Sequence, residues 1–103
     1  MSEFGFATRL SLSFQRALLG EVPCSLRGLT VGWGNSDLEI HCVFDGEIED
    51  DDREAMEVVA SEVVADFPET NHVEVECIRK DFPEDIKQSK LKMWIYLRKE
   101  KTD

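Results

Sequence analysis

The sequence predicts an α+β fold with the order helix, strand, strand, helix, strand, strand, forming a four-stranded, mainly antiparallel sheet with both helices on one face. Two observations carry this prediction: an apolar stripe of helical period in the middle of the chain, and four short segments in which apolar and polar residues alternate. A length of 103 residues fits a single domain, 1–103, which can bury a core without disulfides or metals.

The clearest predicted helix runs from Asp51 to Phe67. Asp51 and Glu54 have the spacing of a capping box, in which each side chain accepts a hydrogen bond from a free backbone N–H of the first turn. Pro68 then ends the helix. Its apolar positions follow the i, i+3, i+4, i+7, i+11 spacing and are Met56, Val59, Ala60, Val63 and Phe67. We expect this stripe to face the core.

The N-terminal region also favours a helix, although residues 1–10 fit both a strand and a helix pattern and are expected to include a loose N-terminal segment. Ser11 or Ser13 is the expected N-cap. Gly20 stands where a left-handed residue commonly ends a helix. The expected inner face consists of Phe14, Ala17 and Leu18.

Two alternating segments follow and predict a hairpin. The first has Leu29, Val31 and Trp33 on one side, and the second has Leu38, Ile40, Cys42 and Phe44. Gly34, Asn35 and Ser36 between them tolerate the positive φ of tight hairpin turns. Asp45-Gly46 then turns the chain into the second helix.

The third strand has Val73, Val75 and Cys77 on its inner side and Glu74 and Glu76 on its outer side. Residues 82–90 are a polar connection that contains a proline. The last strand runs from about Lys92 to Arg98 and leads into a charged tail. Its expected inward residues are Met93, Ile95 and Leu97, and its expected outward residues are Trp94 and Tyr96. Two outward aromatics require cover from a loop or helix, or else form an exposed patch that meets a partner.

Charge is concentrated in the middle of the chain. Residues 47–78 hold 12 acidic residues and 1 basic residue, a net charge of −11, whereas residues 1–46 carry −2 and residues 79–103 carry +3. Such a field repels nucleic acid and anionic membranes and attracts basic proteins, although a solvated face is the simpler alternative. The candidate binding residues, which we call the acidic shoulder, are Asp45, Glu47, Glu49, Asp50, Asp51, Asp52, Glu54 and Glu57.

No catalytic constellation is recognisable, so an enzyme is not expected. His41 and His72 have no Ser or Cys at a nucleophile spacing. These histidines and Cys24, Cys42 and Cys77 offer no CxxC or HxxxH pair for zinc, and EIEDDD lacks the glycine and glutamate of a calcium loop. We therefore expect no cofactor and no metal. The odd cysteine number, the lack of a signal peptide and the lack of a membrane-spanning apolar run predict a reduced, cytoplasmic protein.

Two stretches, FQRALLGEVPCSLRGLTVGW (14–33) and FDGEIEDDDREAMEVVASEVVADF (44–67), together with WIYLRKE (94–100), resemble small bacterial immunity proteins of contact-dependent growth inhibition and related polymorphic toxin systems. The resemblance implies a stoichiometric inhibitor of a cognate C-terminal toxin domain, and such toxins are frequently nucleases. An acidic surface suits that partner, because a nuclease binds a polyanion through Lys and Arg. Expected anchors are Trp33, Trp94 and Tyr96.

The sequence therefore predicts a monomer that binds its toxin in a 1:1 complex and binds neither nucleic acid nor a membrane. A first alternative is an acidic interaction or regulatory module for another basic protein. A second alternative is a small enzyme or metal protein that uses the histidines and cysteines.

Overall fold

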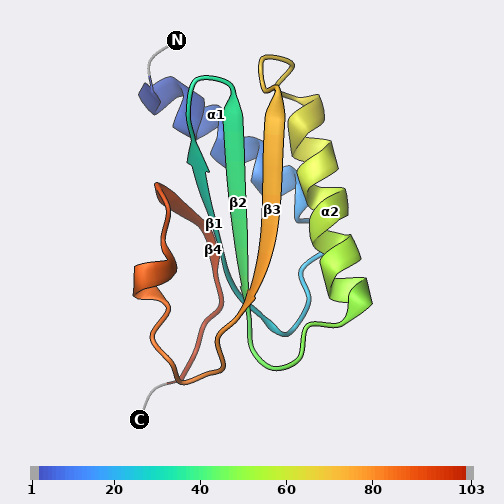
Figure 1. Ribbon diagram of the computed structural model, residues 1–103, viewed down its shortest axis with the longest axis vertical. Helices are drawn as coiled ribbons and strands as arrows, with labels where there is room; N and C mark the ends of the chain where they lie inside the picture. The colour runs from blue at the N-terminus through green and yellow to red at the C-terminus, as the bar shows by residue number, and fades with distance from the viewer. Residues whose placement is uncertain (1–2, 102–103) are drawn as a thin grey trace.

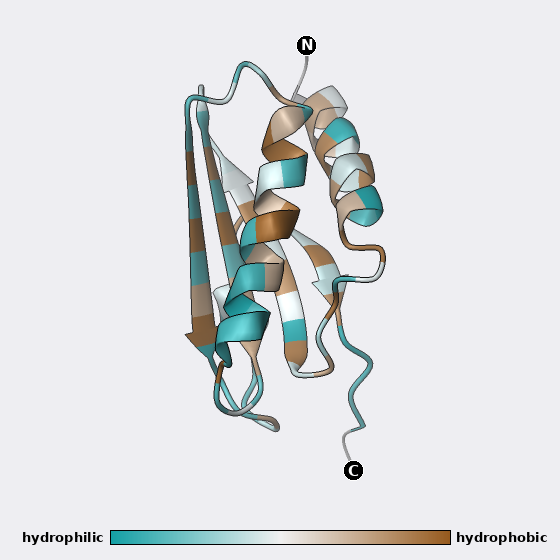
Figure 2. Ribbon diagram, turned by 90° about the vertical axis from the view of Figure 1, so that its right-hand side faces the viewer, coloured by the Kyte–Doolittle hydropathy of each residue, from teal (hydrophilic) through white to brown (hydrophobic). Residues whose placement is uncertain are grey.

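The computed structural model describes residues 3–101, in which two helices cover one face of a four-stranded sheet (Figures 1 and 2). The long elements are α1 (Glu3–Ala17), β1 (Leu26–Trp33), β2 (Asp37–Phe44), α2 (Asp50–Ala65), β3 (His72–Arg79) and β4 (Met93–Leu97). A short 3-10 helix, η1 (Lys87–Ser89), lies between β3 and β4. The predicted α+β class and element order are confirmed. No helix of the described residues is long and apolar enough to cross a membrane.

The sheet has the strand order β3-β2-β1-β4 and is mixed. β1 pairs antiparallel with β2 and with β4, but β2 pairs parallel with β3, because the chain crosses over through α2 between them. β2, β3 and β4 consequently run in the same direction and end at the same end of the molecule, where α2 begins (Figure 1). We call this end the lower pole.

The core lies between the sheet and the two helices. The predicted inner residues of α2 and of the first two strands are buried or, in the case of Trp33, packed against the core. Phe14, Phe44 and Phe67 are among the largest fully buried side chains. Burying a side chain of this size contributes about 1.5–3 kcal/mol, so these three add substantially to the hydrophobic stabilisation of the core.

α1 begins earlier than predicted, and both expected capping serines lie inside it. Residues 3–10 belong to this helix, whereas residues 1–2 are outside the described part of the chain. Ser13 is buried and donates a hydrogen bond to Asp66 at the end of α2. Gly20 has φ +78°, which confirms the predicted left-handed residue just after the helix.

The predicted capping box of α2 is wrong. The helix begins at Asp50, one residue before the expected cap, and Glu49 is the N-cap residue without a side-chain capping hydrogen bond. The helix ends at Ala65, two residues before the predicted end at Phe67. Figure 2 shows the consequence of the sequence pattern: the first turns of α2 are hydrophilic and its later turns carry the apolar residues.

The two turns around β2 differ in their backbone. The hairpin at Gly34–Ser36 is confirmed, with Gly34 N–H donating to Asp37 O at 3.2 Å, but the turn uses no positive φ. The turn at Asp45-Gly46 does use one, with φ +83° at Gly46. Glycine is therefore required by its conformation after β2 and not in the hairpin.

The faces of β4 depart from simple alternation. A bulge opposite Leu29 and Thr30 shifts the register, so Trp94 pairs with Thr30 while Tyr96 pairs with Leu29. Tyr96 therefore packs against the core, contrary to the prediction, together with Met93 and Ile95. Leu97 was expected inside but pairs with Gly28 on the outer face and is 55% exposed. Trp94 lies on the outer face as predicted; it is half-buried and lines a groove together with Ile86 of the 82–90 connection.

Candidate functional site

The structure divides the acidic shoulder into engaged and exposed carboxylates. Within residues 3–101, no ion pair or side-chain hydrogen bond engages the side chains of five of its members. These five, all exposed to solvent, are Glu47, Glu49, Asp50, Asp51 and Glu54. The first four also line a depression of about 520 Å³ where the chain enters α2. The exposed part of the shoulder is thus concentrated at the start of α2.

The other three members have neighbours within the fold. Asp52 accepts a hydrogen bond from the Ser25 hydroxyl at 3.3 Å. Glu57 is exposed and lies in the electrostatic neighbourhood of Cys77. Asp45 accepts hydrogen bonds from Arg98 Nη2 at 3.0 Å and from the Phe82 N–H at 3.1 Å. These bonds, that from Arg98 first, hold the pKa of Asp45 below its ordinary value, so this carboxylate is committed to the fold.

Asp45 belongs to a polar network at the lower pole that the sequence did not reveal. We define the polar network as Arg27, Asp45, Arg98 and Glu100. The Arg27 side chain is only 3% exposed and makes a bidentate pair with Glu100, at 2.7 and 3.0 Å, and a bond to Lys80 O at 2.7 Å. The hydrogen bond with Glu100 raises the pKa of Arg27 and lowers that of Glu100. The available signal was Arg27 itself, because an arginine in the apolar run LRGLTVGW requires a buried partner.

A second polar network ties the two helices together. Asp66, just after α2, accepts hydrogen bonds from the Ser13 hydroxyl at 2.6 Å and from Arg16 Nη2 at 2.7 Å. These bonds, that from Ser13 first, lower the pKa of Asp66. The acidic residues are therefore not equivalent, and this carboxylate supports the packing of α1 on α2.

Trp94 lies in an apolar groove at the lower pole, of about 420 Å³. We define the apolar groove by its large hydrophobic residues, which are Phe82, Ile86, Trp94 and Leu97. The Trp94 ring can lie where it does because residue 28 is a glycine. A Cβ atom on residue 28 would lie 2.7 Å from Trp94 Cζ3. The polar network adjoins the groove through Arg27, Arg98 and Glu100. Arg98 and Phe82 thus line the groove and also bond Asp45.

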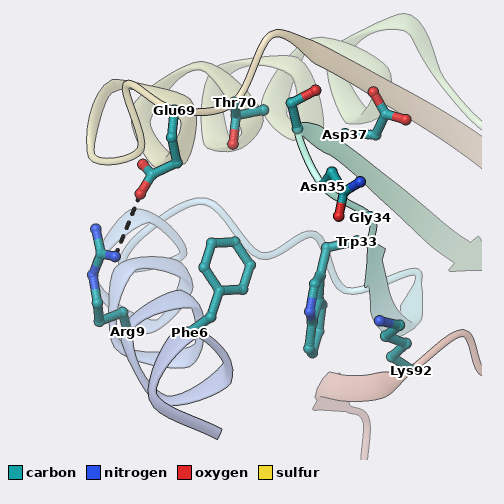
Figure 3. Close-up of a pocket in the computed structure, with 10 residues that line it drawn as sticks. Phe6, Arg9, Trp33, Gly34, Asn35, Asp37, Glu69, Thr70 and Lys92 are labelled. Atoms are coloured by element: carbon teal, nitrogen blue, oxygen red, sulfur yellow. Dashed lines mark ion pairs between the residues drawn. The ribbon is translucent and has the colours of Figure 1, made fainter. Parts of the chain in front are cut away.

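Trp33 lies at the opposite end of the molecule, in a depression of about 480 Å³ beside the hairpin turn (Figure 3). Its ring lies 5.5 Å from that of Phe6, centroid to centroid, and Lys92 Nζ is 4.7 Å from the indole centroid. Arg9 and Glu69 form an ion pair at 3.5 Å on the rim. Trp33 and the exposed shoulder residues therefore belong to different surfaces.

A separate acidic surface occupies the helix-free face of β2 and β3. We define the open sheet face as Glu39, His41, Glu74 and Glu76. His41 Nε2 lies 3.0 Å from a Glu39 carboxylate oxygen and 3.3 Å from one of Glu76, but no hydrogen bond of good geometry forms. Among the described residues, no group of three His, Cys, Asp or Glu side chains is arranged to hold a metal ion.

Comparison with solved structures finds a similar backbone arrangement in a chain described as "MamM CTD - Copper form". The two chains share 13% identity and align with a TM-score of 0.50, over 81% of this protein and 91% of that chain. At this identity the likeness concerns the fold alone. Comparison with curated proteins finds no match.

Comparison with protein families is informative about the role. The family model described as MafI2 immunity protein matches residues 7–100, which include both helices except for the first residues of α1, and every strand. This match confirms the resemblance to small bacterial immunity proteins of toxin systems. The chain therefore belongs to the MafI2 immunity protein family, whose role is to bind a cognate toxin protein and neutralise it.

Proposed function

We propose that the protein neutralises a basic nuclease toxin of a contact-dependent growth inhibition system in the cytoplasm, as a monomer in a 1:1 complex. The observation that carries this proposal is the cluster of exposed carboxylates at the start of α2, which form no ion pair or side-chain hydrogen bond within residues 3–101. The family supports toxin binding in general, and the charge supports a basic partner.

In the free protein these carboxylates are hydrated, so they carry little desolvation free energy, and they repel each other. A basic toxin surface that approaches them is steered by the field, and steered association can reach about 10⁸–10⁹ M⁻¹s⁻¹ at low salt. An acidic surface that occupies the cationic groove of a nuclease also excludes the polyanionic substrate. Charge thus accounts for fast capture and for inhibition by the same contact.

Affinity requires packed anchors in addition to charge. The apolar groove supplies them at the same pole as the exposed shoulder, because Phe82 and Arg98 both bond Asp45 at the base of the shoulder. Phe82 is 36% exposed and Leu97 is 55% exposed, so apolar surface remains for a partner to cover. We therefore place Trp94 and its neighbours in the interface and leave Trp33 and Tyr96 outside it.

The experiment compares two triple variants with the same change in charge. Asp50→Lys, Asp51→Lys and Glu54→Lys reverse the exposed shoulder, while Glu39→Lys, Glu74→Lys and Glu76→Lys reverse the open sheet face. Association with the toxin domain encoded beside this gene is measured at several salt concentrations. We expect the shoulder variant to associate more slowly and with a weaker salt dependence than the sheet variant.

Two outcomes would contradict the proposal at different levels. If the unmodified protein neither forms a tight complex nor suppresses toxin activity, that toxin is not its partner. If it does both but only the sheet variant is impaired, the interface is the open sheet face. Asp52 is left unchanged in both variants because it bonds Ser25.

A further inference from the structure

β2 and β3 place two cysteines side by side. Cys42 and Cys77 are direct partners in the parallel register of these strands. Both belong to the helix-covered side: Cys42 is fully buried in the core, and Cys77 is partly buried against it. Neighbouring strands lie about 4.8 Å apart, which falls within the Cα separation of about 4.4–6.8 Å found in disulfides. Both thiols are free in this structure.

The two thiols are not equivalent. The adjacent Cys42 thiol lowers the pKa of Cys77 to about 7, and Arg53 on α2 acts in the same direction. Burial of Cys77 and the charges of Glu57 and Asp52 oppose this shift. The interaction with Cys77, followed by burial, raises the pKa of Cys42. Cys77 is therefore the more acidic and the less buried of the two thiols, and Cys42 is the less acidic thiol next to it.

We propose that Cys42 and Cys77 form a redox-active pair that closes to an intrachain disulfide when a hydroperoxide oxidises Cys77. The Cys77 sulfur attacks the peroxide, so an S–O bond forms and the O–O bond breaks, and the leaving oxygen takes up a proton. The Cys42 sulfur then attacks Cys77, so an S–S bond forms while the S–O bond breaks, and the thiol proton leaves with the hydroxide as water. With hydrogen peroxide, two thiols are oxidised and one peroxide is reduced to two waters.

The position of the pair gives the bond a structural consequence. Within the described part of the chain β3 is an edge strand paired with β2 alone, and a disulfide would connect the two strands toward their C-terminal ends. The strand spacing of about 4.8 Å exceeds the usual Cβ separation in disulfides of about 3.8 Å, so the bond is strained and readily reduced. The modification is therefore reversible, and it does not depend on the identity of the toxin.

The experiment treats the reduced, full-length protein with hydrogen peroxide, alkylates the remaining thiols and maps the peptides by mass spectrometry. We expect a crosslink between the peptides of Cys42 and Cys77, which loses two hydrogen masses and disappears with reductant. The exposed Cys24 serves as the internal control and should remain alkylated. A chain in which Cys42 stays free while Cys77 is overoxidised, or in which Cys24 reacts first, would overturn the proposal.

Two variants separate the roles of the thiols. Cys42→Ser removes the resolving thiol, so Cys77 should accumulate as a sulfenic acid that dimedone traps. Cys24→Ser should leave crosslinking unchanged. Alkylation of Cys77 in the unmodified protein should reach half of its maximal rate near pH 7, as its lowered pKa requires. A midpoint above pH 8, or no dimedone adduct in a folded Cys42→Ser variant, would show that Cys77 is an inert, buried thiol.

Discussion

The polar network at the lower pole allows a double-mutant cycle. Glu100→Gln removes the charge that pairs with Arg27, whose guanidinium is 3% exposed and then keeps only Lys80 O as a strong acceptor. Removing one partner of a buried ion pair costs about 3–5 kcal/mol. Because Glu100 is itself 17% exposed and water can replace it, we expect a loss of about 2–4 kcal/mol in the free energy of unfolding. For a domain of this size the melting temperature should fall by roughly 10 °C or more.

The second arm of the cycle replaces the buried cation. Arg27→Met removes the buried positive charge. In that background Glu100→Gln should lower the free energy of unfolding by less than about 1 kcal/mol. Urea unfolding of the four proteins at pH 7 measures both values, and Glu62→Gln, at an exposed position on α2, controls for the same change in net charge. Additive losses within about 0.5 kcal/mol would refute the reasoning, because they would show that Arg27 and Glu100 do not depend on each other.

Three further outcomes follow from contacts described above. Gly28→Ala should destabilise the protein by about 1–3 kcal/mol in urea unfolding, because the new Cβ would lie 2.7 Å from Trp94. Gly32→Ala is the control and should destabilise the protein clearly less, because the nearest contact of its new Cβ is 3.4 Å. Equal losses in the two variants would contradict this account. Stability should decline as the pH falls below about 4, because lowered pKa values stabilise the folded state only while the carboxyls are ionised, and a flat urea midpoint down to pH 2 would exclude this contribution. These carboxyls are Asp45, Asp66 and Glu100, together with Asp81, whose pKa is lowered by its hydrogen bonds from Arg79 first and from the Gly46 N–H. Leu97→Ala should weaken toxin binding measured by calorimetry, whereas Leu12→Ala, on α1 and similarly exposed at 60%, should not; the opposite result would move the anchor to α1.

Periodicity predicted the helices and strands because each element buries one face, and that face is visible in a local stretch of sequence. Met56, Val59 and Val63 on α2 show this directly. The predicted faces of β4 were wrong because a single extra residue changes which side chains point inward. The bulge opposite Leu29 and Thr30 breaks the alternation of β4 and turns Tyr96 inward, and the local pattern carries no sign of it. The parallel pairing of β3 depends on a crossover that no local pattern contains.

The candidate site was predictable only in part, for a different reason. Composition located the acidic shoulder but could not distinguish Asp45, which bonds Arg98, from Asp50, which engages no partner within the described residues. The stretches that carried the family resemblance include residues that hold the fold. Arg27 and Glu100 form a buried pair, and Gly46 supplies a positive φ. The resemblance therefore identified the scaffold more directly than the surface that meets the toxin.

Because β2, β3 and β4 run in the same direction, the segments that follow them are gathered at one end of the domain. The segments after these strands, residues 45–49, 80–86 and 98–101, all lie at the lower pole, whereas the hairpin turn and the α2–β3 connection lie at the other (Figure 1). Substitutions at the exposed positions of the first three segments change the surface of this pole while the core side chains of the strands stay in place. A scaffold of this kind can acquire a new toxin specificity through changes at one end, without a new fold.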